Sequence, residues 1–96
     1  MIISFGTGAT EDVYHGISSK RARAFSSEVQ KAARRKMLMI AAAISVVDLR
    51  VPPGNRLEQL RGDLAGFWSV RVNDQWRIVF RWADGSASEV ALVDYH

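Results

Sequence analysis

Two runs of alternating residues, 67–72 and 76–82, constrain the fold more than any other part of the sequence. Large apolar residues occupy every second position, and arginines lie between them. The apolar set is Trp68, Val70, Val72, Trp76, Ile78, Phe80 and Trp82, and the arginines are Arg71, Arg77 and Arg81. Successive side chains of a β-strand point to opposite faces, so these runs predict a sheet with one packed face and one cationic face.

The length of the turn between the two runs decides whether the apolar residues share a face. A two-residue turn at 73–74 would pair Val72 with Gln75 and mix the faces, because a slip of one residue reverses every side chain. A three-residue loop over 73–75 pairs Val72 with Trp76 instead, and it unites the apolar set. We therefore predict the three-residue loop.

A second hairpin is predicted after Trp82. Gly85 suits the left-handed position of a three-residue loop over 83–85. This loop predicts that Trp82 opposes Ser86, Ile78 opposes Val90 and Trp76 opposes Leu92. By alternation, the arginine face then also receives Glu89, Ala91, Val93 and Tyr95.

The segment from about residue 20 to residue 44 predicts the longest helix. It is rich in alanine, and its apolar residues recur at three- and four-residue intervals: Phe25, Val29, Ala32, Ala33, Met37, Ile40, Ala41 and Ile44. This spacing places them along one face of an α-helix, which we expect to cover the apolar face of the sheet.

Shorter elements are predicted around this helix from caps, glycine and proline. The first two are a strand at 2–5 and a helix at 10–15, which Thr10 caps and Gly16 ends. A capping box of Ser45 and Asp48 precedes a helical turn from Val46. Prolines and glycine then break the chain at 52–55, and the rest is predicted to be sheet. The prediction is one α+β domain over residues 1–96, with an antiparallel β-sheet packed on one long helix plus short N-terminal helical segments.

Composition excludes several classes of protein. The chain has 96 residues, 48% of them hydrophobic, which is typical of one folded domain rather than a disordered chain. The sequence has no cysteine, so disulfide and thiolate chemistry are excluded. The N-terminus lacks the features of a signal peptide, and the longest apolar cluster, residues 37–44, is too short to cross a bilayer. We therefore expect a soluble cytoplasmic protein that does not bind a membrane.

The arrangement of the positive charges favours an anionic partner. The net charge is +3, and seven cations lie between residues 20 and 36 against one anion, Glu28. A solvated helix face explains that cluster more simply than a binding site does. On the sheet, neighbouring arginines repel one another, and a phosphate-bearing ligand such as RNA would relieve this repulsion. Ion pairs with Glu89, Asp84 or Asp94 are the alternative explanation for each arginine taken alone.

The sequence gives little support for metal or nucleotide chemistry. Its two histidines, His15 and His96, lack a partner at a spacing suited to a metal, and no glycine-rich phosphate loop is present. We therefore expect no metal and no cofactor. The available residue types are those of metal-free phosphodiester cleavage.

Several motifs resemble the HigB family of bacterial toxins, within the RelE superfamily of type II toxin–antitoxin systems. The resemblance extends from MIISF at the start to the last residue. Its most specific pieces are Leu60-Arg61-Gly62-Asp63 with Gly66, Trp68-Ser69 with Val72, Trp76-Arg77-Ile78, and Asp94-Tyr95-His96.

The resemblance implies a ribosome-dependent endoribonuclease that cuts messenger RNA in the decoding site and so inhibits translation. The family uses no metal: the ribose 2′-hydroxyl attacks the neighbouring phosphate and leaves a 2′,3′-cyclic phosphate. The implied partners are the ribosome, mRNA and a HigA-type helix-turn-helix antitoxin, which neutralises the toxin and represses the shared operon. Operator DNA would be reached only through that antitoxin.

The resemblance also implies site residues. Arg77 would hold the scissile phosphate, and Tyr95 would stack on a base or orient the phosphate. His96 is the best acid or base by intrinsic pKa. The remaining implied catalytic residues are Arg61, where relatives commonly have lysine, Asp94, and Glu58, where relatives often have histidine. Arg71, Arg81 and Arg56 are the candidate RNA-binding residues.

Two alternatives to the cleaving toxin remain open. One is a module that occupies the ribosomal site without cutting, or a weakened toxin that acts mainly within the antitoxin complex. The other is an RNA-binding domain outside the family that uses the arginine face alone.

Overall fold

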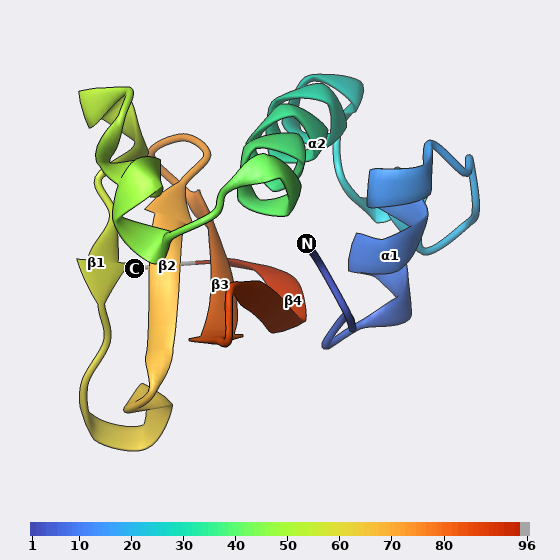
Figure 1. Cartoon of the computed structure of the whole chain (residues 1–96). Helices are drawn as coiled ribbons and strands as arrows, with labels where there is room; N and C mark the ends of the chain where they lie inside the picture. The colour runs from blue at the N-terminus through green and yellow to red at the C-terminus, as the bar shows by residue number, and fades with distance from the viewer. Residues whose placement is uncertain (95–96) are drawn as a thin grey trace.

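A four-stranded antiparallel sheet forms the centre of the molecule in the computed structural model, which describes residues 1–94 (Figure 1). The strands lie in the order β1-β2-β3-β4 and span Glu58–Gln59, Phe67–Arg71, Trp76–Ala83 and Ser86–Asp94. Two α-helices, α1 (Gly8–His15) and α2 (Ser27–Ala42), pack on one face of this sheet. The predicted α+β architecture is confirmed.

The long helix is shorter than its apolar pattern predicts. A 3₁₀ helix covers Ala22–Ala24, Phe25 has an extended backbone, and Ser26 caps α2 by accepting the N–H of Val29 at 3.2 Å. The helix ends at Ala42, so Ile44 lies beyond it and is 86% exposed. The prediction of one helix over 20–44 is therefore wrong at both ends, because a local cap restarts the helix and the chain becomes extended again at Ala43.

The N-terminal helix also differs from its prediction in one respect. Thr7, not Thr10, caps α1, and its side chain accepts the N–H of Thr10 at 3.2 Å. Thr10 is fully buried within the helix, and its hydroxyl accepts the N–H of Leu92 in β4 at 3.0 Å. Gly16 ends the helix in a left-handed conformation, as predicted.

The first hairpin has the predicted register. Val70 lies opposite Ile78 and Arg71 opposite Arg77, and Val72 donates its N–H to the carbonyl of Trp76 at 2.9 Å. Asn73 stabilises the three-residue loop, because its side chain accepts the N–H groups of Gln75 and Trp76.

The second hairpin corrects the prediction. Ala83 pairs with Ser86, so the loop has two residues, Asp84 and Gly85, both with positive φ as type I′ turns require. If this register continued along β3, apolar residues of one strand would lie on the same face as polar residues of the other. A bulge at Glu89, whose φ is 53°, shifts the pairing so that Ile78 opposes Leu92.

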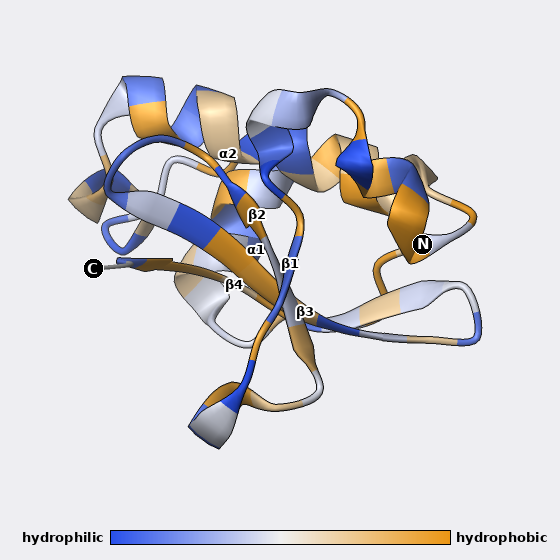
Figure 2. Ribbon diagram, turned by 90° about the vertical axis from the view of Figure 1, so that its left-hand side faces the viewer, coloured by the Kyte–Doolittle hydropathy of each residue, from blue (hydrophilic) through white to orange (hydrophobic). Residues whose placement is uncertain are grey.

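The core lies between the sheet and the helices. Its largest fully buried apolar side chains are Phe80, Met37, Ile40, Ile78, Val70 and Val90. Helix α2 carries both hydrophobic and hydrophilic residues along its length, as expected of a helix with one buried face (Figure 2). A smaller cluster of Leu60, Val79 and Ala91 covers part of the opposite face of the sheet. The face opposite the helices therefore carries apolar residues as well as the predicted arginines.

The remaining segments form turns and bridges. The predicted opening strand is limited to two isolated parallel bridges, Ile2 with Ala87 and Phe5 with Val90. The carboxylate of Asp48 accepts the N–H of Ser45 at 3.0 Å, which is the expected return contact of a capping box, and a 3₁₀ helix covers Val46–Arg50. After the proline break, 3₁₀ helices at Pro53–Asn55 and Gly62–Leu64 interrupt the predicted sheet. Within residues 1–94, no helix is long and apolar enough to cross a membrane.

Asp12 connects α1 to the segment that precedes α2. Its carboxylate accepts from Arg21 Nε and from the hydroxyl of Ser19, each at 2.6 Å. These hydrogen bonds, that of Arg21 first, lower the pKa of Asp12 below its ordinary 3.8. A folded-state pKa below the unfolded value means that this stabilisation is present above about pH 4 and is lost as the pH falls through the lower folded pKa.

We therefore expect Asp12→Asn to lower the melting temperature at pH 7, because the neutral amide lacks the negative charge that strengthens the hydrogen bonds from Arg21 and Ser19. The difference from the wild type should shrink as the pH falls below about 4 and the native carboxylate becomes protonated. Thermal melts of both proteins over this range provide the measurement. A difference that is independent of pH would assign the effect to packing rather than to charge.

Candidate active site

Arg77 lies at the centre of the site, on the face of the sheet opposite the helices. Its Nε donates to the hydroxyl of Ser69 at 2.9 Å, and its Nη2 donates to the backbone carbonyl of Arg56 at 2.7 Å. Only 8% of Arg77 is exposed, so the prediction that it projects from an open arginine face is wrong. Burial of a charged group requires hydrogen-bond partners, which here include a serine and a main-chain oxygen.

The backbone of Arg56 explains how a loop carbonyl reaches Arg77. Arg56 follows the 3₁₀ turn Pro53–Asn55 and adopts φ 46° and ψ 53°, a left-handed conformation that is uncommon for residues other than glycine. The side chain of Arg56 is exposed. The sequence predicted an RNA-binding role for this side chain, whereas the structure also gives its main chain a role in holding Arg77.

Glu58 is the acidic residue that the structure brings to Arg77. Strand β1 pairs Glu58 with Ser69, and this pairing places the Glu58 carboxylate 4.0 Å from Arg77 Nη2. The Glu58 side chain is 52% exposed, so it remains accessible to a ligand on this face. A fixed guanidinium beside an accessible carboxylate is an arrangement that can bind a phosphate and accept a proton.

Arg71 and Arg81 flank Arg77 on the same face, and each has an acidic partner. Arg71 forms an ion pair with Asp74 in the loop. Arg81 Nε donates to the Glu89 carboxylate at 2.8 Å, and its guanidinium lies 4.3 Å from the ring centre of Phe67. The expected repulsion among the three arginines is therefore offset within the chain, and relief by phosphate is not required to explain their position.

Two other predicted site residues, Arg61 and Asp94, lie on the β1–β2 connection and at the end of the last strand. Arg61 is exposed at the start of the 3₁₀ helix Gly62–Leu64, between β1 and β2. Asp94 lies opposite Trp76 and accepts from Gln75 Nε2 at 3.1 Å. Because Val93 opposes Arg77, alternation directs Asp94 to the other face of the sheet.

Tyr95 and His96, which the sequence places in the catalytic cluster, lie outside the described residues. Both follow directly after β4, whose last residue is Asp94. Their proposed roles therefore remain predictions.

Two residues that hold the site together, Ser69 and Asn55, were not predicted to act in it. Ser69 is fully buried, and its hydroxyl is the acceptor for Arg77 Nε. Asn55 is 1% exposed and stabilises the loop that carries Arg56, through Nδ2 donated to the carbonyl of Leu49 at 3.2 Å. A serine among the arginines of an alternating strand was an available signal for the first, whereas the contacts of Asn55 depend on tertiary structure.

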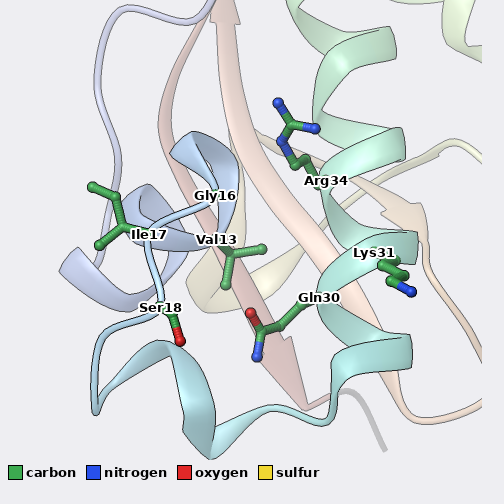
Figure 3. A pocket seen from close by; sticks show the side chains of 7 residues that line it. All are labelled: Val13, Gly16, Ile17, Ser18, Gln30, Lys31 and Arg34. Atoms are coloured by element: carbon green, nitrogen blue, oxygen red, sulfur yellow. The ribbon is translucent and has the colours of Figure 1, made fainter.

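The basic outer side of α2 forms a separate hollow of about 160 Å³, between α2 and the end of α1 (Figure 3). Its lining residues are Val13, Gly16, Ile17, Ser18, Gln30, Lys31 and Arg34. Arg34 closes one side by donating Nε to the carbonyl of Tyr14 at 3.0 Å. None of these residues belongs to the site around Arg77, so this hollow and the sheet site are different surfaces. Among residues 1–94, no group of three or more acidic, histidine or cysteine side chains is arranged to hold a metal ion.

Comparisons with known proteins agree with this architecture. A family model for HigB-like toxins matches residues 9–96. Its description is the RelE-like toxin of the type II toxin-antitoxin system HigB. Toxin HigB-1 of Vibrio cholerae serotype O1 is 42% identical over 92 residues, which are 96% of this chain and 95% of that toxin. Endoribonuclease HigB of Proteus vulgaris is 42% identical over 41 residues, which are 43% of this chain and 45% of that protein.

Solved structures of other toxins share the fold at low sequence identity. A chain of the YoeB-YefM complex from Staphylococcus aureus matches with a TM-score of 0.63 and 17% identity, over 100% of this chain and 98% of that one. YafQ from E. coli matches with a TM-score of 0.58 and 15% identity, over 98% of this chain and 93% of that one. Together with the match to the family model and the identity to the Vibrio toxin, the sheet, the helices and the sequence motifs establish that this chain belongs to the HigB-like family of RelE-like toxins from type II toxin–antitoxin systems.

Proposed function

We propose that this chain is a ribosome-dependent endoribonuclease that cuts mRNA without a metal ion and thereby inhibits translation. The observation that carries the proposal is the guanidinium of Arg77, fixed by Ser69 and the Arg56 carbonyl, with the Glu58 carboxylate 4.0 Å away. The printed name of the Proteus vulgaris relative, an endoribonuclease, supports the same activity. The proposed toxin domain comprises residues 1–96 and acts in the cytoplasm.

The proposed reaction is attack of the ribose 2′-hydroxyl on the adjacent phosphorus. The bond to the 5′-oxygen of the next nucleotide breaks, and the products are a 2′,3′-cyclic phosphate and a 5′-hydroxyl. Arg77 stabilises the additional negative charge on the phosphoryl oxygens as the new bond forms. A base removes the proton of the 2′-hydroxyl, and an acid protonates the leaving 5′-oxygen.

Glu58 and His96 are the proposed base and acid of this reaction. Glu58 is accessible and next to Arg77, so a 2′-hydroxyl whose phosphate lies against Arg77 is within reach of its carboxylate. His96 has the side chain whose ordinary pKa is nearest neutrality, which suits protonation of the leaving oxygen. Tyr95 orients the phosphate or stacks on a base. Arg61 is proposed to support the site from the β1–β2 connection. Asp94, which lies on the other face of the sheet, is proposed to support it only indirectly, by holding the end of the last strand through Gln75.

The exposed cations around the site are proposed to hold the RNA backbone. Arg56 has an exposed side chain, and its backbone carbonyl contacts Arg77. Arg71 and Arg81 lie on the same face of the sheet, each with an acidic partner that a phosphate can replace. Such contacts position RNA without reading its sequence.

The proposed protein partner is a HigA-type helix-turn-helix antitoxin. Support comes from the solved structures of related fold, one of which is a complex of YoeB with YefM. The antitoxin, rather than this chain, is proposed to contact operator DNA.

A second candidate function is occupation of the ribosomal site without cleavage, or a weakened toxin that acts mainly within the antitoxin complex. Two observations favour it. Arg77 is only 8% exposed, which restricts its contact with a phosphate. By the family resemblance, Glu58 stands where relatives often have histidine, which would replace a cation of the site with an anion.

The deciding experiment is a translation reaction with ribosomes, followed by primer extension on the message. The wild type should give discrete cuts within codons, and RNA without ribosomes should remain uncut. We expect Arg77→Ala to lower cleavage by roughly 10²–10³-fold, because it removes the donor to the developing charge. Arg34→Ala is the matched control, since Arg34 also donates to a backbone carbonyl but lies at the separate hollow.

Two outcomes would contradict this proposal. An uncut message under an equally strong translation block would favour the non-cleaving module. Growth inhibition that persists when both Arg77 and Tyr95 are replaced would place the active site elsewhere on the chain.

The proposed role of Glu58 as the base provides a separate prediction. If Glu58 is the base, Glu58→Gln should lower the cleavage rate by about 10²-fold or more, because the amide cannot accept the proton. Glu58→His should retain measurable cleavage, because its imidazole can accept a proton. A glutamine variant that cleaves at the wild-type rate would assign the base to another residue.

Ser69→Ala tests the structural part of the site without RNA. Removal of the hydroxyl leaves the buried Nε of Arg77 without this acceptor, and a hydrogen bond to a charged group contributes about 1.5–3 kcal/mol. We expect urea denaturation to show a loss of stability in this range. Ser88→Ala, at a half-buried position of β4 on the same sheet, is the control and should change the stability much less. Equal stability of the two variants would show that Ser69 does not hold Arg77.

A further inference from the structure

Lys36 and Asn55 connect helix α2 to the loop that precedes β1. Lys36 Nζ donates to Asn55 Oδ1 at 2.6 Å, and Asn55 Nδ2 donates to the carbonyl of Leu49 at 3.2 Å. Asn55 is 1% exposed, so its amide depends on partners within the protein. The ammonium group of Lys36 therefore fixes the orientation of a buried amide in the loop.

Arg56 extends this connection to the site. It follows Asn55 directly and holds a left-handed backbone, with φ 46°, which a non-glycine residue adopts at a cost and which surrounding contacts must maintain. In this conformation its carbonyl accepts Arg77 Nη2 at 2.7 Å. A continuous series of contacts thus leads from Lys36 through Asn55 and Arg56 to Arg77.

The surroundings of Lys36 distinguish it from the other cations of α2. Burial lowers the pKa of its ammonium group, and repulsion from Arg35 and Arg71 lowers it further. A lysine that only solvates a helix face extends into water, away from other cations. Lys36 instead lies partly buried, with a neutral amide oxygen as its acceptor. Lys36 therefore makes a structural contact, with Asn55, at the edge of the site.

We propose that Lys36 is a positioning residue for RNA cleavage: it holds Asn55, which fixes the Arg56 carbonyl and thereby sets the guanidinium of Arg77. This inference rests on the function proposed above for Arg77. Lys36 acts through Arg77 and does not itself bind the scissile phosphate.

The kinetic test compares Lys36→Met, Lys36→Arg and the control Lys31→Met in ribosome-dependent cleavage. Methionine retains most of the unbranched stem and removes the ammonium group, whereas arginine restores a cationic donor. We expect Lys36→Met to lower the rate at saturating ribosome by about 10–10²-fold, since small misplacements of a catalytic group have effects of this size. The half-saturating ribosome concentration should stay unchanged, and Lys36→Arg should recover most of the rate. Lys31→Met, on the same helix but at the hollow, should keep the wild-type rate.

Two kinetic results would overturn the inference. A raised half-saturating concentration with an unchanged rate at saturation would mean that Lys36 binds RNA directly. A rate deficit that Lys36→Arg does not relieve, together with a lower melting temperature in both variants, would mean that Lys36 only stabilises the fold.

A readout without cleavage keeps this test separate from the proposed function. The Nε–H signal of Arg77 in the free protein can be assigned in ¹⁵N nuclear magnetic resonance spectra by its absence in Arg77→Lys. We expect slow hydrogen exchange of this proton in the wild type and in Lys31→Met, and exchange faster by about tenfold in Lys36→Met. Unchanged exchange in Lys36→Met would refute the series of contacts. An unreactive wild type with the expected exchange pattern would instead refute the proposed cleavage and leave the positioning of Arg77 intact.

Discussion

The buried guanidinium of Arg77 imposes requirements on three separate parts of the structure. A charged group removed from water must be matched by hydrogen bonds, or burial destabilises the fold by several kcal/mol. Strand β2 meets this requirement with the Ser69 hydroxyl, and the loop before β1 meets it with the Arg56 carbonyl. β1, although only two residues long, is where the chain places Glu58 beside the same group. Fold stability and the candidate chemistry therefore depend on the same contacts.

This dependence also explains why the arginine face is not a simple cationic surface. Leu60, Val79 and Ala91 form an apolar cluster beside Arg77, so much of the face is packed. Arg71 and Arg81 retain acidic partners at its margins. The result is a central cation held by hydrogen bonds within the chain, with two cations paired to acidic residues at the margins of the face.

The sequence predicted the elements whose pattern is strictly local. Alternation determined the register of β2 and β3, because only one turn length unites the apolar residues. The same reasoning failed for β3 and β4, where a two-residue turn and the bulge at Glu89 compensate for each other. Nothing in the side-chain pattern marks that bulge, since a glutamate with positive φ is unusual. The start of α2 was missed for a related reason: Ser26 provides a cap within a continuous apolar stripe.

The site was predictable to the extent that it lies on strands of regular pattern. The face of Arg77 followed from alternation, and the roles proposed for Arg77 and Glu58 rest on the resemblance to a toxin family. Its burial, and the contacts of Asn55 and Lys36, arise from a loop whose path no periodic pattern encodes. The resemblance grouped Asp94 with Arg77, but the register of the last strand places Asp94 on the other face of the sheet.

The pairing of the chain's first residues with its last strand has a consequence for synthesis. Ile2 and Phe5 bridge to β4, and Thr10 in α1 accepts a hydrogen bond from Leu92, across 82 positions of sequence. Such contacts cannot form while the last strand is still inside the ribosomal exit tunnel. A nascent chain of this protein therefore lacks its complete core until β4 has left the tunnel. The segment that is synthesised first therefore gains its partners only after β4 has emerged.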